Sequence, residues 1–236
     1  NTLGPTVLAS LCRFNGARLV MFSSDLVFDG TKGAPYTELD AVAPLSTYGR
    51  SKVAAEQAVL GGLPEALVIR TGPFFGPWDR RNFLTQTLHA LERGERVRAA
   101  ADTVMSPSYV PDLVHAALDL LLDGAHGLWH LSNQGAVSWM ELVRTVALMK
   151  GLQAHHIEGC DVGSLGLPAA RPRLSVLESH HGVLLPTLED ALERYLSERE
   201  QAPVPEASSL GAGRSVCGIC RGMPPPDGRH RCEFHL

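Results

Sequence analysis

The 236-residue sequence contains no stretch that approaches the ~20 consecutive apolar residues of a membrane-spanning helix. It also has no excess of basic residues, because its formal net charge is −4, and among its 21 Lys and Arg residues the only lysines are Lys32, Lys52 and Lys150. We therefore expect no nucleic acid and no membrane among its partners. Apolar residues make up 44 % of the chain and charged residues 19 %, which is typical of a folded protein with a packed core.

The five cysteines are too unevenly placed to form the disulfide framework of a small secreted domain. Cys12 and Cys160 are isolated, and the other three lie close to the end of the chain. A reducing, cytoplasmic environment is the better expectation. The sequence begins with Asn1 rather than Met, and no charged and then apolar leader follows, so we expect a fragment or a processed product.

The last part of the chain, residues 201–236, is rich in Pro and Gly and poor in core-forming residues, which predicts a disordered tail. The alternative to disorder is a tetrahedral zinc site in this tail. Its candidate ligands are Cys217, Cys220, Cys232 and His235, which form two pairs with the spacing of such a site. The pairs His155-His156 and His180-His181 have no carboxylate or cysteine at ligand spacing, so we interpret them as surface or loop histidines.

Strand and helix patterns alternate along the first 75 residues. Short apolar runs predict buried strands over 17–22 and 66–70, and helical spacing predicts a helix from Tyr48 to Leu60 between them. Ser46 or Thr47 can cap that helix. An earlier helix is expected over 6–14. The order strand, helix, strand predicts a right-handed parallel unit.

The pattern continues, less regularly, to about residue 200. We expect one further strand over 128–131 and helices over 82–93, 110–122, 138–150 and 188–199. The predicted fold class is α/β, with strands 17–22, 66–70 and 128–131 in part of a doubly wound parallel sheet and a small mixed α/β lobe beside it.

Tyr48 and Lys52 form the most informative pair in the sequence. Residues four apart lie on one face of a helix, and a lysine beneath a tyrosine hydroxyl favours the phenolate, which would lower the tyrosine pKa from about 10. Such a tyrosine can donate a proton to a carbonyl oxygen. The alternative is a solvated pair on the helix surface. Ser23 and Ser24 follow the strand that precedes this helix, where they either face a ligand or satisfy the loop backbone.

Three further polar residues allow two interpretations each. Arg70, at the end of a predicted buried strand, could meet a phosphate or pair with a core carboxylate, and the sequence does not decide between them. Asn82 could contact a sugar nucleotide, although capping of the following helix is favoured. Asp112 begins a helix, where a structural role is favoured over a catalytic one.

Three segments together resemble a known family. Phe22–Gly30 (FSSDLVFDG), Pro35–Glu38 (PYTE) and Pro44–Lys52 (PLSTYGRSK) are similar to extended short-chain dehydrogenases/reductases, above all to the dTDP-4-dehydrorhamnose reductase family. Later segments fall in the order of that family, so that the resemblance covers about residues 1–200: Asp102–Asp112, Gly127–Ser132 with Ser138–Glu141, and Arg171–Leu177.

The resemblance implies a Rossmann-like reductase that transfers hydride from NADPH or NADH to the C4 ketone of a nucleotide-linked deoxysugar. It implies catalytic roles for Ser24, Tyr48 and Lys52, with Tyr48 as the proton donor. Cofactor contacts are implied for Ser23, Tyr48, Lys52 and Arg70, and substrate contacts for Ser24, Asp25, Asn82 and Arg171. Either a homo-oligomer or a complex with a partner protein is possible.

The sequence departs from the family in three places. No Gly-rich phosphate-binding turn is present, and by alignment roughly 80 residues, or two to three βα units, would precede Asn1. Leu26 replaces the usual tyrosine, and the segment Arg70–Phe74 lacks the tryptophan of the family. A different sugar or carbonyl substrate is therefore possible.

These departures also leave a second functional class open: a non-catalytic subunit like the regulatory subunit of methionine adenosyltransferase, which resembles the same family. With only part of the dinucleotide cradle, the 236-residue chain is expected to bind NADPH poorly and to show little reductase activity. An exposed sheet edge and apolar helix faces are expected to favour association.

Overall fold

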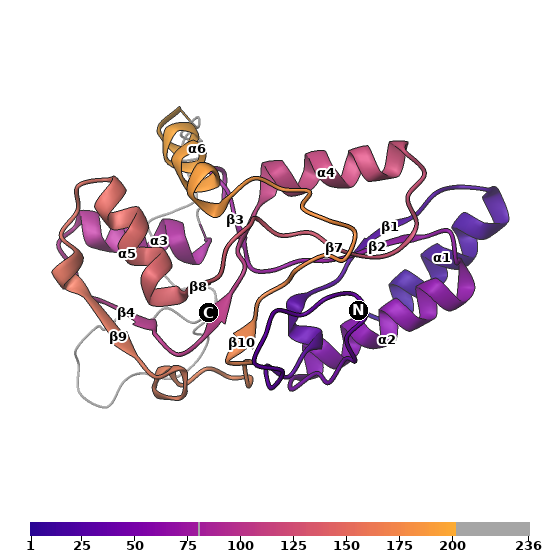
Figure 1. Ribbon diagram of the computed structural model, residues 1–236, viewed down its shortest axis with the longest axis horizontal. Helices are drawn as coiled ribbons and strands as arrows, with labels where there is room; N and C mark the ends of the chain where they lie inside the picture. Colours follow the sequence, from indigo (N-terminus) through magenta and orange to yellow (C-terminus); the bar gives the residue numbers. More distant parts are fainter. Residues whose placement is uncertain (80, 202–236) are drawn as a thin grey trace, which may run out of the picture.

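The computed structural model describes residues 1–79 and 81–201 of the protein (Figure 1). The predicted tail lies outside this part of the chain from residue 202 onward, and so do the zinc ligand candidates Cys217, Cys220, Cys232 and His235.

A three-stranded parallel sheet forms the centre of one lobe. Its strands are β1 (Val20–Phe22), β2 (Leu67–Arg70) and β7 (Gly127–His130), in the order β1-β2-β7. Helices α1 (Leu3–Asn15) and α2 (Thr47–Gly62) cover one face, and α4 (Val110–Leu122) covers the other (Figure 1). This confirms the predicted parallel sheet and its three strands.

The boundaries of all three strands differ somewhat from the prediction, the second only in beginning at Leu67 instead of residue 66. The first strand begins at Val20 instead of residue 17, because the chain is still leaving α1: Gly16 adopts the left-handed conformation, and the amide of Ala17 donates to the carbonyl of Cys12. The third begins at Gly127 and ends at His130, so it is shifted by one residue from the predicted 128–131.

Alternate residues of β2 supply two separate cores, which explains its uninterrupted apolar run. Val68 packs with α1 and α2, whereas Leu67 and Ile69 pack with α4. The first core also contains Ala9, Met21, Ala55, Val59, Leu63 and Ala66, and the second contains Leu113, Ala117, Leu131 and Leu185.

The second lobe is built on a parallel pair of strands, β4 (Val97–Ala100) and β9 (Ile157–Cys160), which packs with helices α3 (Phe83–Glu92) and α5 (Trp139–Met149). The C-terminal helix α6 (Leu188–Gln201) packs on the core that α3 and α5 share. The mixed α/β character of this lobe is as predicted, although the sequence analysis assigned no strand to it.

Very short strands join the two lobes. β3 (Phe74–Phe75) pairs with β6 (Ser108–Tyr109), and β5 (Val104–Met105) lies between β8 (Val137–Ser138) and β10 (Leu174–Ser175). Three single-turn 3-10 helices complete the described elements: Asp25–Val27, Ala154–His156 and Val162–Leu165.

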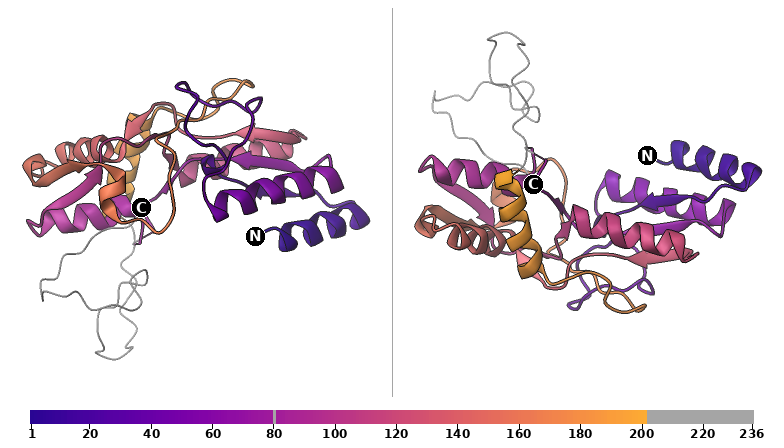
Figure 2. Two further views of the ribbon diagram at one scale, coloured as in Figure 1. Left: turned by 90° about the horizontal axis from the view of Figure 1, so that it is seen from below. Right: turned by 90° about the horizontal axis from the view of Figure 1, so that it is seen from above.

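The chain passes back and forth between the lobes, which lie side by side along the long axis (Figure 2). After β10 it returns to the first lobe, where Tyr36 forms a β-bridge with Leu177. The amide of Tyr36 donates to the carbonyl of Val176 at 2.8 Å, and the amide of Glu178 donates to the carbonyl of Tyr36 at 2.9 Å. The loop around Tyr36 is thus paired with the segment around Leu177, which lies about 140 positions later in the sequence.

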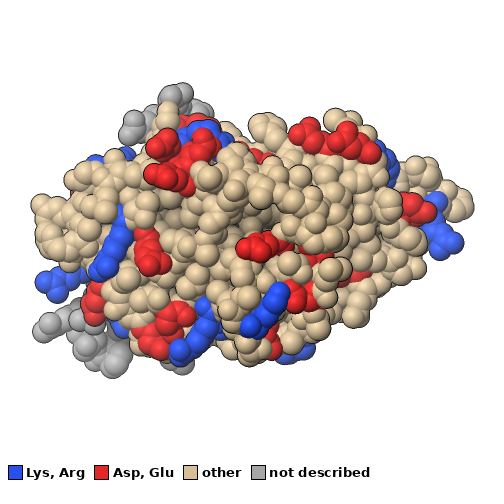
Figure 3. Space-filling view, viewed as in Figure 1, with Lys and Arg blue, Asp and Glu red and all other residues tan. Residues whose placement is uncertain are grey.

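Within residues 1–79 and 81–201, no helix is long and apolar enough to cross a membrane. On the face drawn in Figure 3, the described acidic and basic side chains form small groups of both signs without a continuous basic stretch.

Candidate active site

A cavity of about 410 Å³ lies at the carboxyl ends of β1 and β2. In a parallel sheet this is the edge at which ligands bind. Both lobes contribute to the wall, the second lobe through the segment around β10 and through α5. Polar lining residues are Ser23, Ser24, Asp25, Ser46, Tyr48, Thr71, Thr103, Arg171 and Ser175, and apolar ones include Leu26, Pro73, Phe74, Met105 and Trp139.

Ser24 and Asp25 follow β1 directly and enter this cavity. The Ser24 hydroxyl donates to Asp25 Oδ1 at 3.0 Å and accepts from the amide of Leu26 at 3.1 Å, so it caps the 3-10 turn that begins at Asp25. Both interpretations of this serine therefore apply, since it satisfies the loop backbone and also lines the cavity. Burial raises the pKa of Asp25, against hydrogen bonds from Ser175 and Ser24 and the charge of Arg171.

Tyr48 lies in the first turn of α2, which Ser46 caps by accepting a hydrogen bond from the amide of Gly49 at 3.0 Å. Its side chain is 44 % exposed and lines the cavity, as does that of Ser24, which is near enough to lower the pKa of Tyr48. The two hydroxyls therefore line one cavity.

The expected lowering of the Tyr48 pKa is wrong for this structure. Burial raises the pKa of Tyr48 and the negative charge of Asp25 raises it further, while the side chain of Ser24 and the charge of Arg171 act in the opposite direction. Tyr48 is accordingly a neutral phenol at physiological pH.

Lys52 does not lower the Tyr48 pKa because its ammonium group binds elsewhere. Its Nζ donates to the carbonyl of Phe22, at the end of β1, at 2.9 Å, and lies 5.7 Å from the centre of the Tyr48 ring. The two side chains do share one helix face, as their spacing predicts. Burial lowers the pKa of Lys52, partly offset by the charge of Glu56.

Gly49 lets α2 approach the loop that carries Ser24. A Cβ atom at this position would come within 2.2 Å of the carbonyl oxygen of Leu26 and within 2.8 Å of the Cβ of Pro44. Only glycine fits without a shift of the backbone, so the glycine beside Tyr48 sets how closely the tyrosine can lie to Ser24.

Arg70 takes the carboxylate alternative of the two that the sequence left open. Its guanidinium binds Glu56 on α2 through two hydrogen bonds, 3.0 Å from Nε and 2.7 Å from Nη2. The hydroxyl of Ser23 donates to the same carboxylate. Ser23 and Arg70 thus hold the ends of β1 and β2 against α2, and their contact with a cofactor stays a prediction. Glu56, one helical turn beyond Lys52, has no local pattern in the sequence that marks it as this partner.

Asn82 caps α3, which was the favoured alternative. Its Oδ1 accepts from the amide of Leu84 at 2.9 Å and its Nδ2 donates to the carbonyl of Phe74, and it does not line the cavity. Asp112 is structural, as favoured: it forms two hydrogen bonds with Arg194, of 2.6 and 2.8 Å.

Arg171 does line the cavity, and its charge lowers the pKa of both Asp25 and Tyr48. Ser175, which hydrogen-bonds Asp25, was not singled out from the sequence although the same Arg171–Leu177 segment contains it. Trp139 was also missed as a lining residue, because nothing in its local pattern separates a cavity wall from a core.

Comparison with known proteins gives a consistent result. The family model described as RmlD substrate binding domain matches residues 1–200. The chain is 36 % identical over 189 residues to a dTDP-4-dehydrorhamnose reductase of Mycobacterium tuberculosis (strain CDC 1551 / Oshkosh), covering 78 % of this chain and 62 % of that protein. It is 33 % identical over 175 residues to a dTDP-4-keto-6-deoxy-D-glucose reductase of Streptomyces niveus, covering 74 % and 60 %.

Among solved structures, the chain is similar to a dTDP-4-dehydrorhamnose reductase of Bacillus anthracis (strain Ames) in complex with NADP. The TM-score is 0.79 at 29 % identity, with 84 % of this chain and 72 % of that one covered. This likeness confirms the predicted α/β, Rossmann-like fold class. The chain spans about three fifths of the length of the two curated relatives named above.

Proposed function

Because this chain belongs to the RmlD substrate binding domain family, we propose that it carries the proton-transfer site of an NAD(P)H-dependent reductase of nucleotide-linked keto-sugars. Such a protein would be an extended short-chain dehydrogenase/reductase acting in the cytoplasm. The observation that carries the proposal is that Ser24 and Tyr48 both line a cavity at the carboxyl ends of the parallel strands.

The protonation state of Tyr48 suits reduction of a ketone. Like any tyrosine, Tyr48 is protonated at physiological pH and can donate its proton to a carbonyl oxygen as that oxygen gains charge, although its raised pKa makes it a weaker acid than a free tyrosine. The Ser24 hydroxyl, beside it, would hydrogen-bond the same oxygen and hold the ketone in line with the phenol. Asp25, held by Ser24 and Ser175, keeps Ser24 in place.

The residues present fit a nicotinamide cofactor in part. Tyr48 lines the cavity, and Lys52 lies on the same face of α2 but is not among the lining residues. Together they would hold the nicotinamide ribose, where the Lys52 ammonium can exchange its backbone acceptor, the carbonyl of Phe22, for a ribose hydroxyl. When bound, NADPH or NADH supplies the hydride. The sequence contains no Gly-rich turn for the pyrophosphate.

The substrate is proposed from the relatives, which are named as reductases of dTDP-linked 4-keto sugars. Arg171, at the cavity, offers a cation for the substrate, while Leu26, Pro73 and Phe74 make the nearby wall apolar. An apolar wall favours a sugar with few hydroxyls on that side.

The test compares Tyr48→Phe with the unchanged protein, using NADPH or NADH and dTDP-4-dehydrorhamnose. It is run on the 236-residue chain and, where the gene encodes preceding residues, on the longer product. Loss of the phenol should lower turnover by about 10²- to 10⁴-fold and leave cofactor binding unchanged. Tyr36→Phe is the control, because that hydroxyl binds Asp29 away from the cavity. Equal turnover of Tyr48→Phe and the unchanged protein, in whichever product has measurable activity, would refute the proposal.

A second function, that of a regulatory subunit, is favoured by one observation. The outer side of α1 exposes five large apolar side chains, Leu3, Val7, Leu8, Leu11 and Phe14. Exposed apolar groups of this kind mark contacts with other proteins or other parts of a chain. This alternative would be supported if the chain formed a stable complex with another protein through α1 and if the longer product had no reductase activity.

A further inference from the structure

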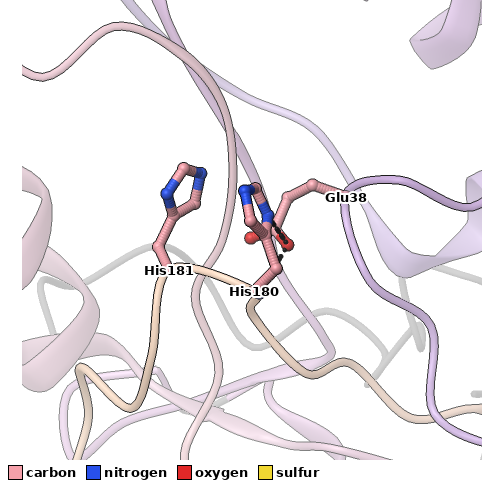
Figure 4. Close-up of side chains that lie close together, drawn as sticks. All are labelled: Glu38, His180 and His181. Carbon is pink, nitrogen blue, oxygen red and sulfur yellow. Dashed lines mark hydrogen bonds and ion pairs between the residues drawn. The ribbon is translucent and has the colours of Figure 1, made fainter.

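One carboxylate and two histidines from distant parts of the chain converge at a place separate from the cavity (Figure 4). Glu38 comes from the loop before α2, and His180 and His181 come from the segment that returns after β10. One ligand atom from each lies within 4.8 Å of the others. Both histidines are exposed in a loop, as predicted, and the carboxylate beside them is 142 positions away in the sequence, where ligand spacing could not reveal it.

The loop that carries the two histidines is already fixed by Glu38. The Ser179 hydroxyl donates to Glu38 Oε1 at 2.6 Å, and the amide of His180 donates to Oε2 at 3.0 Å. The amide of His181 in turn donates to the Ser179 hydroxyl at 3.2 Å. Since these bonds hold the backbone of the loop in place, binding of an ion here would cost little conformational entropy.

Two of the three ligand atoms are already at the separation that a metal requires. Glu38 Oε2 and His180 Nδ1 lie 3.1 Å apart. Ligands of a tetrahedral zinc ion with bonds of about 2.0–2.1 Å lie roughly 3.3 Å from each other. Glu38 Oε1 accepts two hydrogen bonds, from Ser179 and from the amide of His130 at 2.7 Å, whereas Oε2 accepts one backbone hydrogen bond, from the amide of His180, so Oε2 is the oxygen that would bind the ion.

The His181 side chain can reorient to become the third ligand. The His181 side chain is exposed and stacks on the Trp129 ring, with ring centres 3.8 Å apart. Its ring also lies 3.9 Å from that of His180, centre to centre. A rotation of the exposed ring would bring a nitrogen to the ion, at the cost of the stacking contact. A fourth position would face solvent, where water completes a tetrahedron.

We propose that Glu38, His180 and His181 bind a divalent transition-metal ion of the zinc type. Two imidazoles with a single carboxylate oxygen select such ions over Mg²⁺ and Ca²⁺, which prefer several oxygen ligands. The ion would link the loop before α2 to the segment after β10. Because none of the three residues lines the cavity, this proposal is independent of the proposed reductase function.

The experiment measures Zn²⁺ affinity of the full 236-residue chain by competition with a chromophoric chelator, and uses Co²⁺ to report coordination geometry. The chain carries Cys217→Ser, Cys220→Ser, Cys232→Ser and His235→Ala throughout, so that the tail lacks its four candidate ligands. His180→Ala and His181→Ala are the test variants, because both side chains are exposed, and circular dichroism checks that each variant is folded. His155→Ala with His156→Ala is the matched control, since this second histidine pair has no carboxylate grouped with it in the described residues.

We expect one Zn²⁺ per chain, a tetrahedral Co²⁺ spectrum, and affinity lowered about tenfold or more in each test variant but unchanged in the control. Glu38→Gln, with its fold checked by circular dichroism, should weaken Zn²⁺ binding as well. The proposal would be overturned if the chain did not bind one equivalent of Zn²⁺, or if the test and control variants had equal Zn²⁺ affinity. Full Zn²⁺ affinity in a folded Glu38→Gln protein would overturn it as well.

Discussion

Arg70 on β2 binds Glu56 on α2 through two hydrogen bonds, and both side chains are about 95 % buried. Glu56 also accepts from Ser23 at the end of β1. One carboxylate therefore joins two strands to the helix that carries Tyr48 and Lys52. Because α2 carries both residues, this ion pair fixes the side of the cavity at which the proposed proton transfer would take place.

Arg70→Met should be strongly destabilising, because it leaves the Glu56 carboxylate buried without its cation. We expect a loss of about 3–5 kcal/mol in the free energy of unfolding, measured by urea denaturation. Glu95→Gln is the control: it breaks an exposed pair with Arg93 and should cost less than about 1 kcal/mol. Similar losses in the two variants would contradict the role assigned to the buried pair.

Two glycines of α2 should respond to alanine with opposite signs. Gly49→Ala places a Cβ against the carbonyl oxygen of Leu26 and should destabilise by about 1–3 kcal/mol, with a matching loss of activity. Gly61→Ala meets no atom within 4 Å and should stabilise by about 0.5–1 kcal/mol. Thermal or urea unfolding of both variants measures the difference. A stabilising Gly49→Ala would show that the loop and the helix are not in close contact.

The contribution of Asp112 to the free energy of unfolding should depend on pH. Although burial opposes its ionisation, hydrogen bonds from Arg194 and Asn133 hold the pKa of Asp112 below its ordinary value. A carboxyl whose pKa is lowered on folding stabilises the protein above its unfolded pKa of about 3.9, and that contribution disappears as pH falls through the folded pKa. The gap in unfolding free energy between the unchanged protein and Asp112→Asn should therefore be largest near pH 6–7 and should shrink below about pH 4.

Glu65→Gln serves as the control for Asp112→Asn, because it removes an exposed carboxylate from the loop before β2. Its stability difference should stay small at every pH. A difference for Asp112→Asn that stays constant from pH 7 to pH 3 would mean that the Arg194 pair does not stabilise the fold.

The 236-residue chain should bind NADPH weakly, because its sequence contains no Gly-rich turn to receive the pyrophosphate. Titration followed by nicotinamide fluorescence measures this directly. Saturable binding at micromolar concentrations would refute the prediction and would show that the site around Tyr48 and Lys52 is sufficient. Lys52→Met would then identify how much of that binding depends on the ammonium group.

The central sheet could be predicted because each strand is a continuous apolar run, which needs no information from elsewhere in the chain. The strands β3, β5, β6, β8 and β10 could not, because two residues have no periodicity. β4 and β9 could not be predicted for another reason, because small residues such as Ala99 and Gly159 give them little apolar character.

The residues of the candidate site divide in the same way. Tyr48, Lys52 and Ser24 could be predicted from local spacing and from the resemblance to a family. The partner of Arg70 could not, since only the folded helix places Glu56 against it. The direction of the Tyr48 pKa shift was likewise beyond the sequence, because it depends on burial and on how far Lys52 reaches toward Phe22.

The return of the chain from β10 to the first lobe has a consequence for how the protein unfolds. Tyr36 pairs with Leu177, and Glu38 holds Ser179 and His180, so the early loop completes its hydrogen bonds only when a segment some 140 positions later is in place. Neither lobe is a continuous length of chain that could be cut out and keep its structure. Unfolding should therefore be a single cooperative transition, and a protease cut near residue 178 should loosen both lobes together.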